Sequence, residues 1–388
     1  MDRENSYKYV TLMICWLGFF SNWLSRGIIP VVLPSISQEF GLAYKEASLL
    51  SAILFFAYAG CQIPSGLVAD RYGRKVTMVL CTLSYSGAML LTGLTASTYG
   101  HLLLFHSLIG VGTAFYFVPA IDIISDSFPR GKLGKALGIY FTAPSLGMIA
   151  APLIAAPLTE NFGWIAPYFV CAFLGFILAS MIQLAAKEPH QREKKAFEGR
   201  LPSILDVFTD KNINKIAVIN FMTAQVMGLF SLIPLYLVNE QHTTLSFAGL
   251  VFAVLQLGSL IGSPLGGVLS DRFSRKAIII AMLLASTAIY LFEFFSEFSY
   301  SVFLLVFARL FHIAITPSMS AYITETTHQS ERGKVFSYTN TITILGIATA
   351  SITIGAIADT FGFVSSFIFL AIVYSFGSVI ALSLKKID

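Results

Sequence analysis

The sequence predicts an all-α membrane protein with twelve transmembrane helices in two pseudo-symmetric six-helix bundles. Three observations lead to this fold class. First, 56% of the 388 residues are hydrophobic and only 12% are charged, whereas a soluble globular domain carries about 25% charged residues. Second, apolar runs long enough to cross a bilayer follow one another along the chain. Third, the second half of the chain repeats motifs of the first.

Twelve runs match the length of about 20 apolar residues that a helix needs to cross the hydrocarbon core. They cover residues 8–34, 46–69, 76–96, 100–124, 136–158, 164–186, 213–238, 246–270, 277–296, 300–325, 334–359 and 361–384. Because twelve is an even number, we expect the two ends of the chain on one side of the membrane.

The lysines and arginines indicate which side that is. All but three lie at the chain ends, in the central polar segment or in loops after even-numbered runs. Lys45 falls on the opposite side, and Arg26 and Arg309 fall inside runs. Since Lys and Arg concentrate in cytoplasmic loops, we predict a multi-pass protein of the cell membrane with both termini in the cytoplasm.

One long polar segment, residues 187–215, divides the chain into two halves of six runs each. The predicted organisation is an N-terminal bundle over 1–186, a cytoplasmic linker over 187–212 and a C-terminal bundle over 213–388. Four apolar residues at helical spacing predict a short interfacial helix in the linker: Leu201, Ile204, Leu205 and Phe208. A flexible linker is an equally good interpretation.

The two halves share motifs in corresponding places. GLVADRYGRK at 66–75 recurs 201 positions later as GVLSDRFSRK at 267–276. NFGW at 161–164 recurs 199 positions later as TFGF at 360–363. Acidic residues at the ends of the fourth and tenth runs, Asp126 and Glu325, are also 199 positions apart. A duplicated six-helix unit is typical of transporters built from repeats.

On these motifs the chain resembles the major facilitator superfamily along essentially its whole length. The family's loop signature between the second and third spans, G-x-x-x-D-R-x-G-R-[KR], is matched by Gly66, Asp70, Arg71, Gly73, Arg74 and Lys75. A degenerate copy between the eighth and ninth spans is also expected of the family. The resemblance implies a secondary transporter that works by alternating access on a small-molecule substrate.

In the family this loop locks the halves together on the cytoplasmic side, and the resemblance implies a cytoplasmic gate here. Its first set of residues is Gly66, Asp70, Arg71, Gly73, Arg74 and Asp126, and its weaker copy is Asp271, Arg272, Arg275 and Glu325. Arginines on helix ends can pair with carboxylates on neighbouring helix ends, and Asp126 and Glu325 are available partners. The alternative is that these arginines only enforce topology.

Ionisable side chains inside spans mark functional sites by default. The predicted substrate-binding residues are Arg26, Arg309, His106, Asn22, Gln225 and His312. The resemblance implies that the first, fourth, seventh and tenth spans line one central chamber, where the arginine fork favours carboxylate or phosphate. NWLSR at 22–26 resembles the N-Y-x-D-R pattern of organic anion transporters in the superfamily, although Ser25 replaces its aspartate. Structural pairing of the arginines and plain packing of His106 are the alternatives.

Asp122 and His106 are the candidates for proton coupling. Asp122 lies one helical turn before Asp126 and shares its face, so it could equally belong to the gate. Glu293 and Glu297, near the outer end of the ninth run, are expected to face water or lipid headgroups.

The predicted function is therefore secondary active transport of a small organic anion, such as a carboxylate, coupled to protons or another ion. The alternative is a proton-driven antiporter that exports amphipathic or drug-like compounds, favoured by the 34 phenylalanines. We expect no enzymatic activity, since H-E-x-x-H, G-x-S-x-G and P-loop motifs are absent from the sequence. We further expect no metal, no cofactor, no nucleic acid partner and a monomer in the lipid bilayer.

Overall fold

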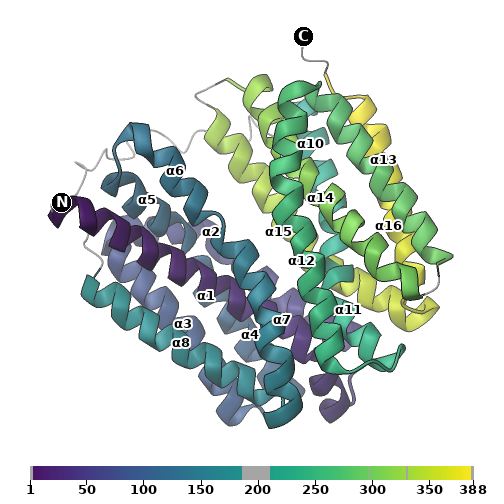
Figure 1. Ribbon diagram of the computed structural model, residues 1–388, viewed down its shortest axis with the longest axis horizontal. Coiled ribbons are helices and arrows are strands. Elements are labelled where there is room, and N and C mark those ends of the chain that lie inside the picture. Colours follow the sequence, from purple (N-terminus) through teal and green to yellow (C-terminus); the bar gives the residue numbers. More distant parts are fainter. Residues whose placement is uncertain (1–2, 186–209, 297, 329–330, 386–388) are drawn as a thin grey trace. The chain divides into compact units, whose positions relative to one another are not determined.

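The computed structural model describes residues 3–185, 210–296, 298–328 and 331–385 (Figure 1). Every regular element in these ranges is an α-helix. The helices are α1 (Arg3–Phe40), α2 (Tyr44–Tyr72), α3 (Arg74–Thr95), α4 (Tyr99–Ala114), α5 (Phe117–Ser127), α6 (Arg130–Tyr140), α7 (Ala143–Phe162), α8 (Ile165–Ala185), α10 (Lys211–Ala224), α11 (Val226–Asn239), α12 (Leu245–Arg272), α13 (Arg275–Phe294), α14 (Phe298–Thr326), α15 (Arg332–Phe361) and α16 (Ser365–Leu382). The predicted interfacial helix in the linker lies outside the described residues.

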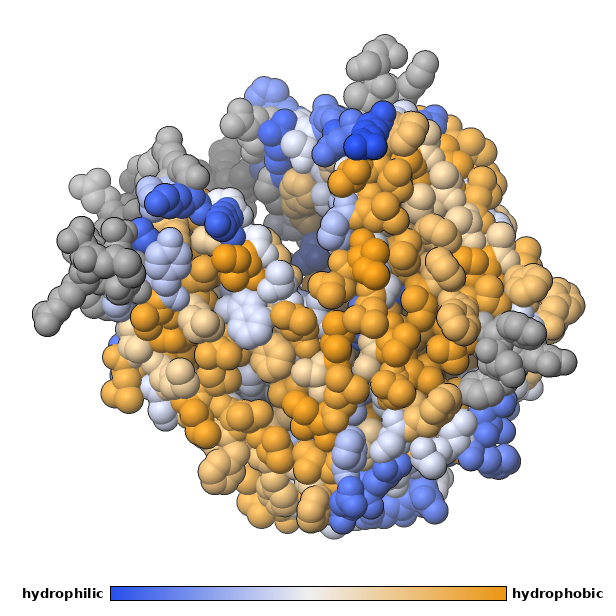
Figure 2. Space-filling model, in the orientation of Figure 1, coloured by the Kyte–Doolittle hydropathy of each residue, from blue (hydrophilic) through white to orange (hydrophobic). Residues whose placement is uncertain are grey.

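The fold class predicted from the sequence is confirmed. Within the described ranges, eleven helical stretches are long and apolar enough to cross a membrane, and α2, with 29 residues, occupies the place of the remaining predicted run. Large apolar side chains point outward, as Leu184 and Phe173 do with 87% and 71% of their surface exposed. On the face shown in Figure 2, hydrophobic residues cover the helix sides and hydrophilic residues gather near helix ends. Lipid solvates such a surface, whereas water does not.

Three predicted spans are interrupted in the structure. The fourth span is broken between α4 and α5, the fifth between α6 and α7, and the seventh at Gln225 between α10 and α11. In the fifth span Pro144 stands in the first turn of α7, where it has no backbone N–H to continue a helix from α6. The corresponding spans of the other half, α14, α15 and α1, are continuous. The duplicated units have therefore diverged in local structure.

The repeat is visible in matching backbone turns. Gly163 ends α7 with φ +85°, and Gly362 ends α15 with φ +82°. Both glycines combine positive φ with ψ near 160°, a region that is essentially restricted to glycine. The sequence pairs NFGW and TFGF thus adopt one turn geometry.

The described chain divides into two compact units. Unit 1 comprises 1–42, 49–192 and 233–253, and unit 2 comprises 43–48, 193–232 and 254–388. In unit 1, α1 packs on α7 and α8, and α3 packs on α4 and α8. In unit 2, α13 packs on α14 and α16, and α10 packs on α15 and α16. Each predicted bundle supplies most of one unit, but two short segments, 43–48 and 233–253, associate with the unit of the other half.

The interiors of the units are rich in tyrosine. Among the largest fully buried side chains are Tyr85, Tyr116, Tyr140 and Tyr168 in unit 1 and Tyr290, Tyr322 and Tyr374 in unit 2. Most exposed aromatic side chains are phenylalanines, such as Phe303, Phe361 and Phe295. A lipid-facing surface has no hydrogen-bond partners to offer, so polar rings are placed inside, where they can bond to one another and to the backbone.

Candidate functional site

The first loop motif forms an ion pair between neighbouring helices of unit 1. Arg74 opens α3, and its Nε donates to Asp122 Oδ2 of α5 at 2.8 Å. Gly73 precedes it with φ +95°, in a backbone region that other residues rarely adopt, so this glycine sets the direction in which α3 leaves the turn. Asp126 lies one turn after Asp122 on α5. Arg74 thus contacts Asp122, the carboxylate for which the sequence predicts either a gate role or a proton-coupling role.

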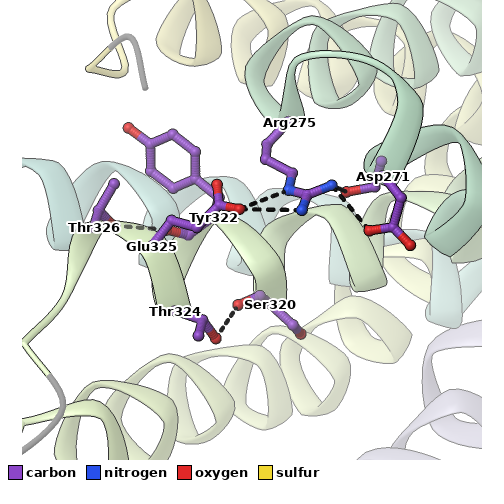
Figure 3. A network of polar contacts seen from close by, with 8 residues as sticks. Asp271, Arg275, Ser320, Tyr322, Thr324, Glu325 and Thr326 are labelled. Carbon is purple, nitrogen blue, oxygen red and sulfur yellow. Dashed lines mark hydrogen bonds and ion pairs between the residues drawn. The ribbon is translucent and has the colours of Figure 1, made fainter. Parts of the chain in front are cut away.

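The second copy of the motif forms a related cluster in unit 2 (Figure 3). Arg275 donates from Nε and Nη2 to Glu325 Oε1 at 3.2 and 3.1 Å, and from Nη1 to Asp271 Oδ1 at 3.2 Å. Ser274 replaces the glycine of the first copy and has an ordinary negative φ of −55°. Glu325 corresponds in the repeat to Asp126, which lies one helical turn after Asp122 and also interacts with Arg74.

The other predicted gate residues lie at or near the ends of α2 and α12, the helices that precede the two turns. Asp70, Arg71 and Arg272 are exposed, and the Arg71 guanidinium lies 5.5 Å from the ring centroid of Tyr72. Gly66 lies within α2.

Arg26 is a buried cation in the middle of α1. Its guanidinium carbon lies 4.1 Å from the ring centroid of Tyr58 and 5.0 Å from that of Trp23. Nη2 donates to the backbone carbonyl of Thr113 at 3.4 Å, and Asn22 Nδ2 donates to the same oxygen at 3.2 Å. This carbonyl is available because α4 ends at Ala114, and the last four carbonyls of a helix have no partner within it.

Polar atoms around Arg26 remain unpaired within the described part of the chain. Arg26 Nε and Asn22 Oδ1 are both buried and have no hydrogen-bond partner there. A buried donor without a partner is costly. Arg26 therefore keeps one buried N–H donor, at Nε, and Asn22 keeps one buried acceptor, and no group of the described chain bonds to either.

Arg309 is the corresponding buried cation of unit 2. Nε donates to Ser259 Oγ at 2.7 Å, Nη2 to Gln256 Oε1 at 3.2 Å and Nη1 to Met227 Sδ at 3.0 Å. Its guanidinium carbon lies 4.8 Å from the ring centroid of Phe230. These partners come from two helices, α11 and α12, while Arg309 itself lies in α14.

Neither guanidinium is neutralised by a carboxylate among the residues that the structure describes. Arg26 is 7% exposed and Arg309 5% exposed, and their contacts are with carbonyl, amide, hydroxyl, thioether and aromatic groups. Cations inside a span are usually paired. Two cations surrounded by neutral groups create a positive potential that an anion would relieve.

The two predicted histidines are each bonded to a buried tyrosine. His106 Nδ1 donates to the Leu102 carbonyl at 2.8 Å, so Nε2 accepts from Tyr168 Oη at 2.9 Å. Both nitrogens are then occupied, which fits a packing role. In unit 2, Tyr374 Oη donates to the Thr223 carbonyl at 3.1 Å, so His312 Nδ1, 2.7 Å from that Oη, is the donor and Nε2 is left as an acceptor.

Gln225 lies at the interruption between α10 and α11. Its Nε2 donates to the Gly346 carbonyl at 3.2 Å and to Thr349 Oγ1 at 3.3 Å, both on α15. The contact fixes the broken span against its neighbour in unit 2.

Glu293 corrects an expectation from the sequence. It does not face water or headgroups: it is 2% exposed, and its Oε1 accepts from Ser301 Oγ, while Oε2 has no partner among the described residues. The prediction was wrong because it considered only the position of Glu293 near the end of α13, whereas α14 follows closely and Ser301 of that helix contacts the carboxylate.

Sequence reasoning missed several contacts of the buried cations: Tyr58, Trp23, Gln256, Ser259, Met227 and Phe230. Gln256 carried a usable signal, since an amide inside the apolar run 246–270 is costly unless it bonds. The aromatic and thioether groups carried none. The described residues contain no group of three or more His, Cys, Asp or Glu that could hold a metal ion.

Comparisons with known proteins agree with this architecture. An uncharacterized MFS-type transporter from Methanocaldococcus jannaschii is 27% identical over 96% of this chain and 95% of that protein. The multidrug resistance protein MdtG of Yersinia enterocolitica is 25% identical over 95% of this chain and 91% of its own length. The crystal structure of a bacterial homolog of the human lysosomal transporter Spinster, inward-facing and occupied, superposes with a TM-score of 0.86 at 19% identity, covering 97% of both chains. The sequence profile of the Major Facilitator Superfamily matches residues 15–242 and 216–388, and the chain therefore belongs to the Major Facilitator Superfamily.

Proposed function

We propose that this protein is a secondary active transporter for a small organic anion, working by alternating access and coupled to protons. The observation that carries the proposal is the pair of buried guanidiniums, Arg26 and Arg309, whose contacts in the described chain are neutral. A guanidinium in a low-dielectric setting binds a carboxylate or phosphate through two parallel hydrogen bonds. An anionic substrate would supply the charge that the protein lacks at each arginine.

The aromatic rings beside the arginines add a preference. Tyr58 and Trp23 flank Arg26, and Phe230 flanks Arg309. Rings that stack on a guanidinium leave it weakly hydrated and offer apolar surface to a ligand. We therefore expect an anion with an apolar or aromatic body rather than a compact inorganic ion.

The described ion pairs of the predicted gate residues join helices of the same repeat. Arg74 with Asp122, and Arg275 with Glu325, link helix ends that we assign to the cytoplasmic side from the distribution of lysine and arginine. The ion pair with Arg74 favours a structural role for Asp122 at this helix end over that of a proton carrier. In this proposal the two bundles, 1–186 and 213–388, move as the transporting bodies of a monomer in the cell membrane, with both termini in the cytoplasm.

Export of amphipathic drug-like compounds by proton exchange is the second candidate. It is favoured by the name of the relatives, multidrug resistance protein, at 25 to 26% identity. Such compounds are often cationic, and cations would be repelled by unpaired guanidiniums. The two candidates therefore predict opposite responses when the arginines are neutralised.

The test uses purified protein in proteoliposomes with radiolabelled aromatic carboxylates, phosphate esters and a cationic dye, with and without a pH gradient. Loss of a bidentate charged contact costs about 1.5–3 kcal/mol, so Arg26→Gln and Arg309→Gln should each lower anion transport at least tenfold. Lys211→Gln removes one exposed positive charge outside the spans and should leave transport unchanged. Dye transport that survives both arginine substitutions, with no anion transport in the wild type, would replace the first candidate by the second.

A further inference from the structure

We propose that Glu160 and Asp359 are two equivalent latches at the outward ends of the helices, and that both must release before the protein can open to the outside. The inference rests on the alternating-access function proposed above. Each latch is a carboxylate that accepts hydrogen bonds from the first turn of a helix belonging to the other sequence repeat.

The first latch lies within unit 1. Glu160 is in the last turn of α7, and its Oε1 accepts from the backbone N–H of Ser246 at 2.7 Å, while Oε2 accepts from Ser246 Oγ. Ser246 is the second residue of α12. Its segment, 233–253, is part of unit 1 although it belongs to the second repeat of the sequence.

The second latch lies within unit 2 and has the same form. Asp359 is in the last turns of α15, and its two oxygens accept from the N–H groups of Tyr44 and Lys45 at 2.9 and 2.8 Å. These residues open α2. Their segment, 43–48, is part of unit 2 although it belongs to the first repeat.

The two latches occupy equivalent places in the repeat. Glu160 and Asp359 are 199 positions apart, the spacing of Gly163 and Gly362, which end the same helices. Lys45 and Ser246 are 201 positions apart, the spacing of the two loop motifs. Each repeat thus has an acid near the end of one helix and a helix start that bonds to the acid of the other repeat. The acid is Glu in the first repeat and Asp in the second.

Each latch pairs a negative carboxylate with the start of a helix, which is a favourable electrostatic contact. The first N–H groups of a helix have no partner within it, and the start of a helix carries partial positive charge. A carboxylate accepts hydrogen bonds from these N–H groups and also balances the partial positive charge. The four acceptor contacts lie at exposed positions, so water can replace them and the latches can release.

A close helix contact lies one turn inside each latch. A Cβ atom added to Gly249 of α12 would lie 2.7 Å from Ala156 Cβ of α7. A Cβ atom added to Gly355 of α15 would overlap with Ser48 Oγ of α2. The backbones therefore approach as closely as glycine permits, and each carboxylate closes the outer end of such a contact.

The cytoplasmic ion pairs have a different connectivity. Arg74–Asp122 and Arg275–Glu325 each join helices of one repeat. Glu160–Ser246 and Asp359–Lys45 each join helices of opposite repeats. Movement of one bundle against the other would leave the ion pairs intact and break the latches.

The test measures the latches without needing a substrate. Spin labels are placed in a variant whose native cysteines are replaced, at Asn161→Cys with Thr243→Cys for the first latch and at Ala43→Cys with Thr360→Cys for the second. Pulsed electron resonance then gives the distance distribution of each pair in liposomes. We expect a dominant short distance, and Glu160→Gln with Asp359→Asn should raise the ratio of long to short distances about tenfold.

Glu39→Gln is the matched control. Glu39 Oε2 accepts from Trp164 Nε1 at 2.6 Å within one repeat, so its loss should leave both distances unchanged. Unchanged distances in the double variant, or equal changes in the control, would overturn the proposal. Each single variant is measured as well, so that poor folding of the double variant leaves the proposal testable. The distance measurement needs no substrate. The latch proposal can therefore be confirmed or overturned independently of the anion proposal, which is tested by transport.

Discussion

At the scale of single residues, buried polar groups fall into two classes. Most find partners inside their unit, as His106 does with Tyr168 and Leu102. Fifteen buried side-chain atoms in the described part of the chain have no partner there, among them Arg26 Nε and the hydroxyl of Tyr140. An unpaired buried group is either an unrelieved cost or the sign of a missing ligand. For Arg26, whose charge would attract an anion, a ligand is the better explanation. The Tyr140 ring stacks on that of Phe19 with 4.7 Å between the ring centroids, so its unpaired hydroxyl is better explained as a cost of packing the ring.

We predict that Tyr168→Phe lowers stability by about 1–3 kcal/mol, because it leaves His106 Nε2 buried without a donor. Tyr140→Phe removes a hydroxyl that has no partner in the described chain and should be neutral or stabilising. Both are measured by thermal unfolding in one detergent. A loss from Tyr140→Phe as large as that from Tyr168→Phe would contradict the assignment of these hydrogen bonds.

We predict that Arg74→Gln costs at least as much stability as Asp122→Asn, since both break the Arg74–Asp122 ion pair and Arg74 also interacts with Asp126 and Asp70. The pair is partly exposed, with 22% and 39% of its side chains accessible, so each change should cost about 1 kcal/mol or less. The double variant should be no worse than Arg74→Gln alone. Transport driven by a pH gradient should persist in all three, and its selective loss in Asp122→Asn would make Asp122 a proton carrier instead.

At the scale of helices, interruptions and glycine turns shape the units. The break between α4 and α5 frees the carbonyls of Gly112 and Thr113, which accept from Cys81, Asn22 and Arg26. A continuous helix would have used these oxygens itself. The broken span therefore supplies the anchor that holds Arg26 in place.

We predict that Gly163→Ala and Gly362→Ala each destabilise the protein by about 1–3 kcal/mol, because their backbone conformation is essentially limited to glycine. Space is not the cause, since a Cβ atom at either site would meet nothing within 4 Å. Gly87 has the same open space within α3, and Gly87→Ala should be neutral or stabilise by about 0.5 kcal/mol. Thermal unfolding separates the two classes, and equal losses at all three sites would refute the argument.

At the scale of the whole molecule, we infer the orientation in the membrane from the distribution of charge. The outward assignment of Glu160, Asp359 and Lys45, and the cytoplasmic assignment of the two loop motifs, follow from one asymmetry of lysine and arginine. The assignments of the loop motifs and of the latches to the two sides of the membrane both use that orientation. An inverted chain would exchange the gate and the latches.

We predict that Lys45→Cys reacts with a membrane-impermeant maleimide in intact cells and that Lys211→Cys reacts only after the membrane is opened. Both side chains are exposed, so access to the reagent and not burial should decide the outcome. The native cysteines are replaced beforehand. Labelling of Lys211→Cys from outside, with Lys45→Cys protected, would reverse the topology.

The sequence by itself determined the fold class, the duplicated organisation and the positions of the charged turns in the chain. These follow from run length, charge and repeated motifs, which are local properties of the chain read against the thickness of a bilayer. Only the tertiary structure decided which groups meet. It paired Arg74 with Asp122, buried Glu293, broke the fourth span above Arg26 and brought Glu160 and Asp359 to helix starts of the opposite repeat. Such contacts depend on helix rotation and on approach distances of a few ångströms between residues far apart in the chain, and periodicity in one sequence does not fix these distances.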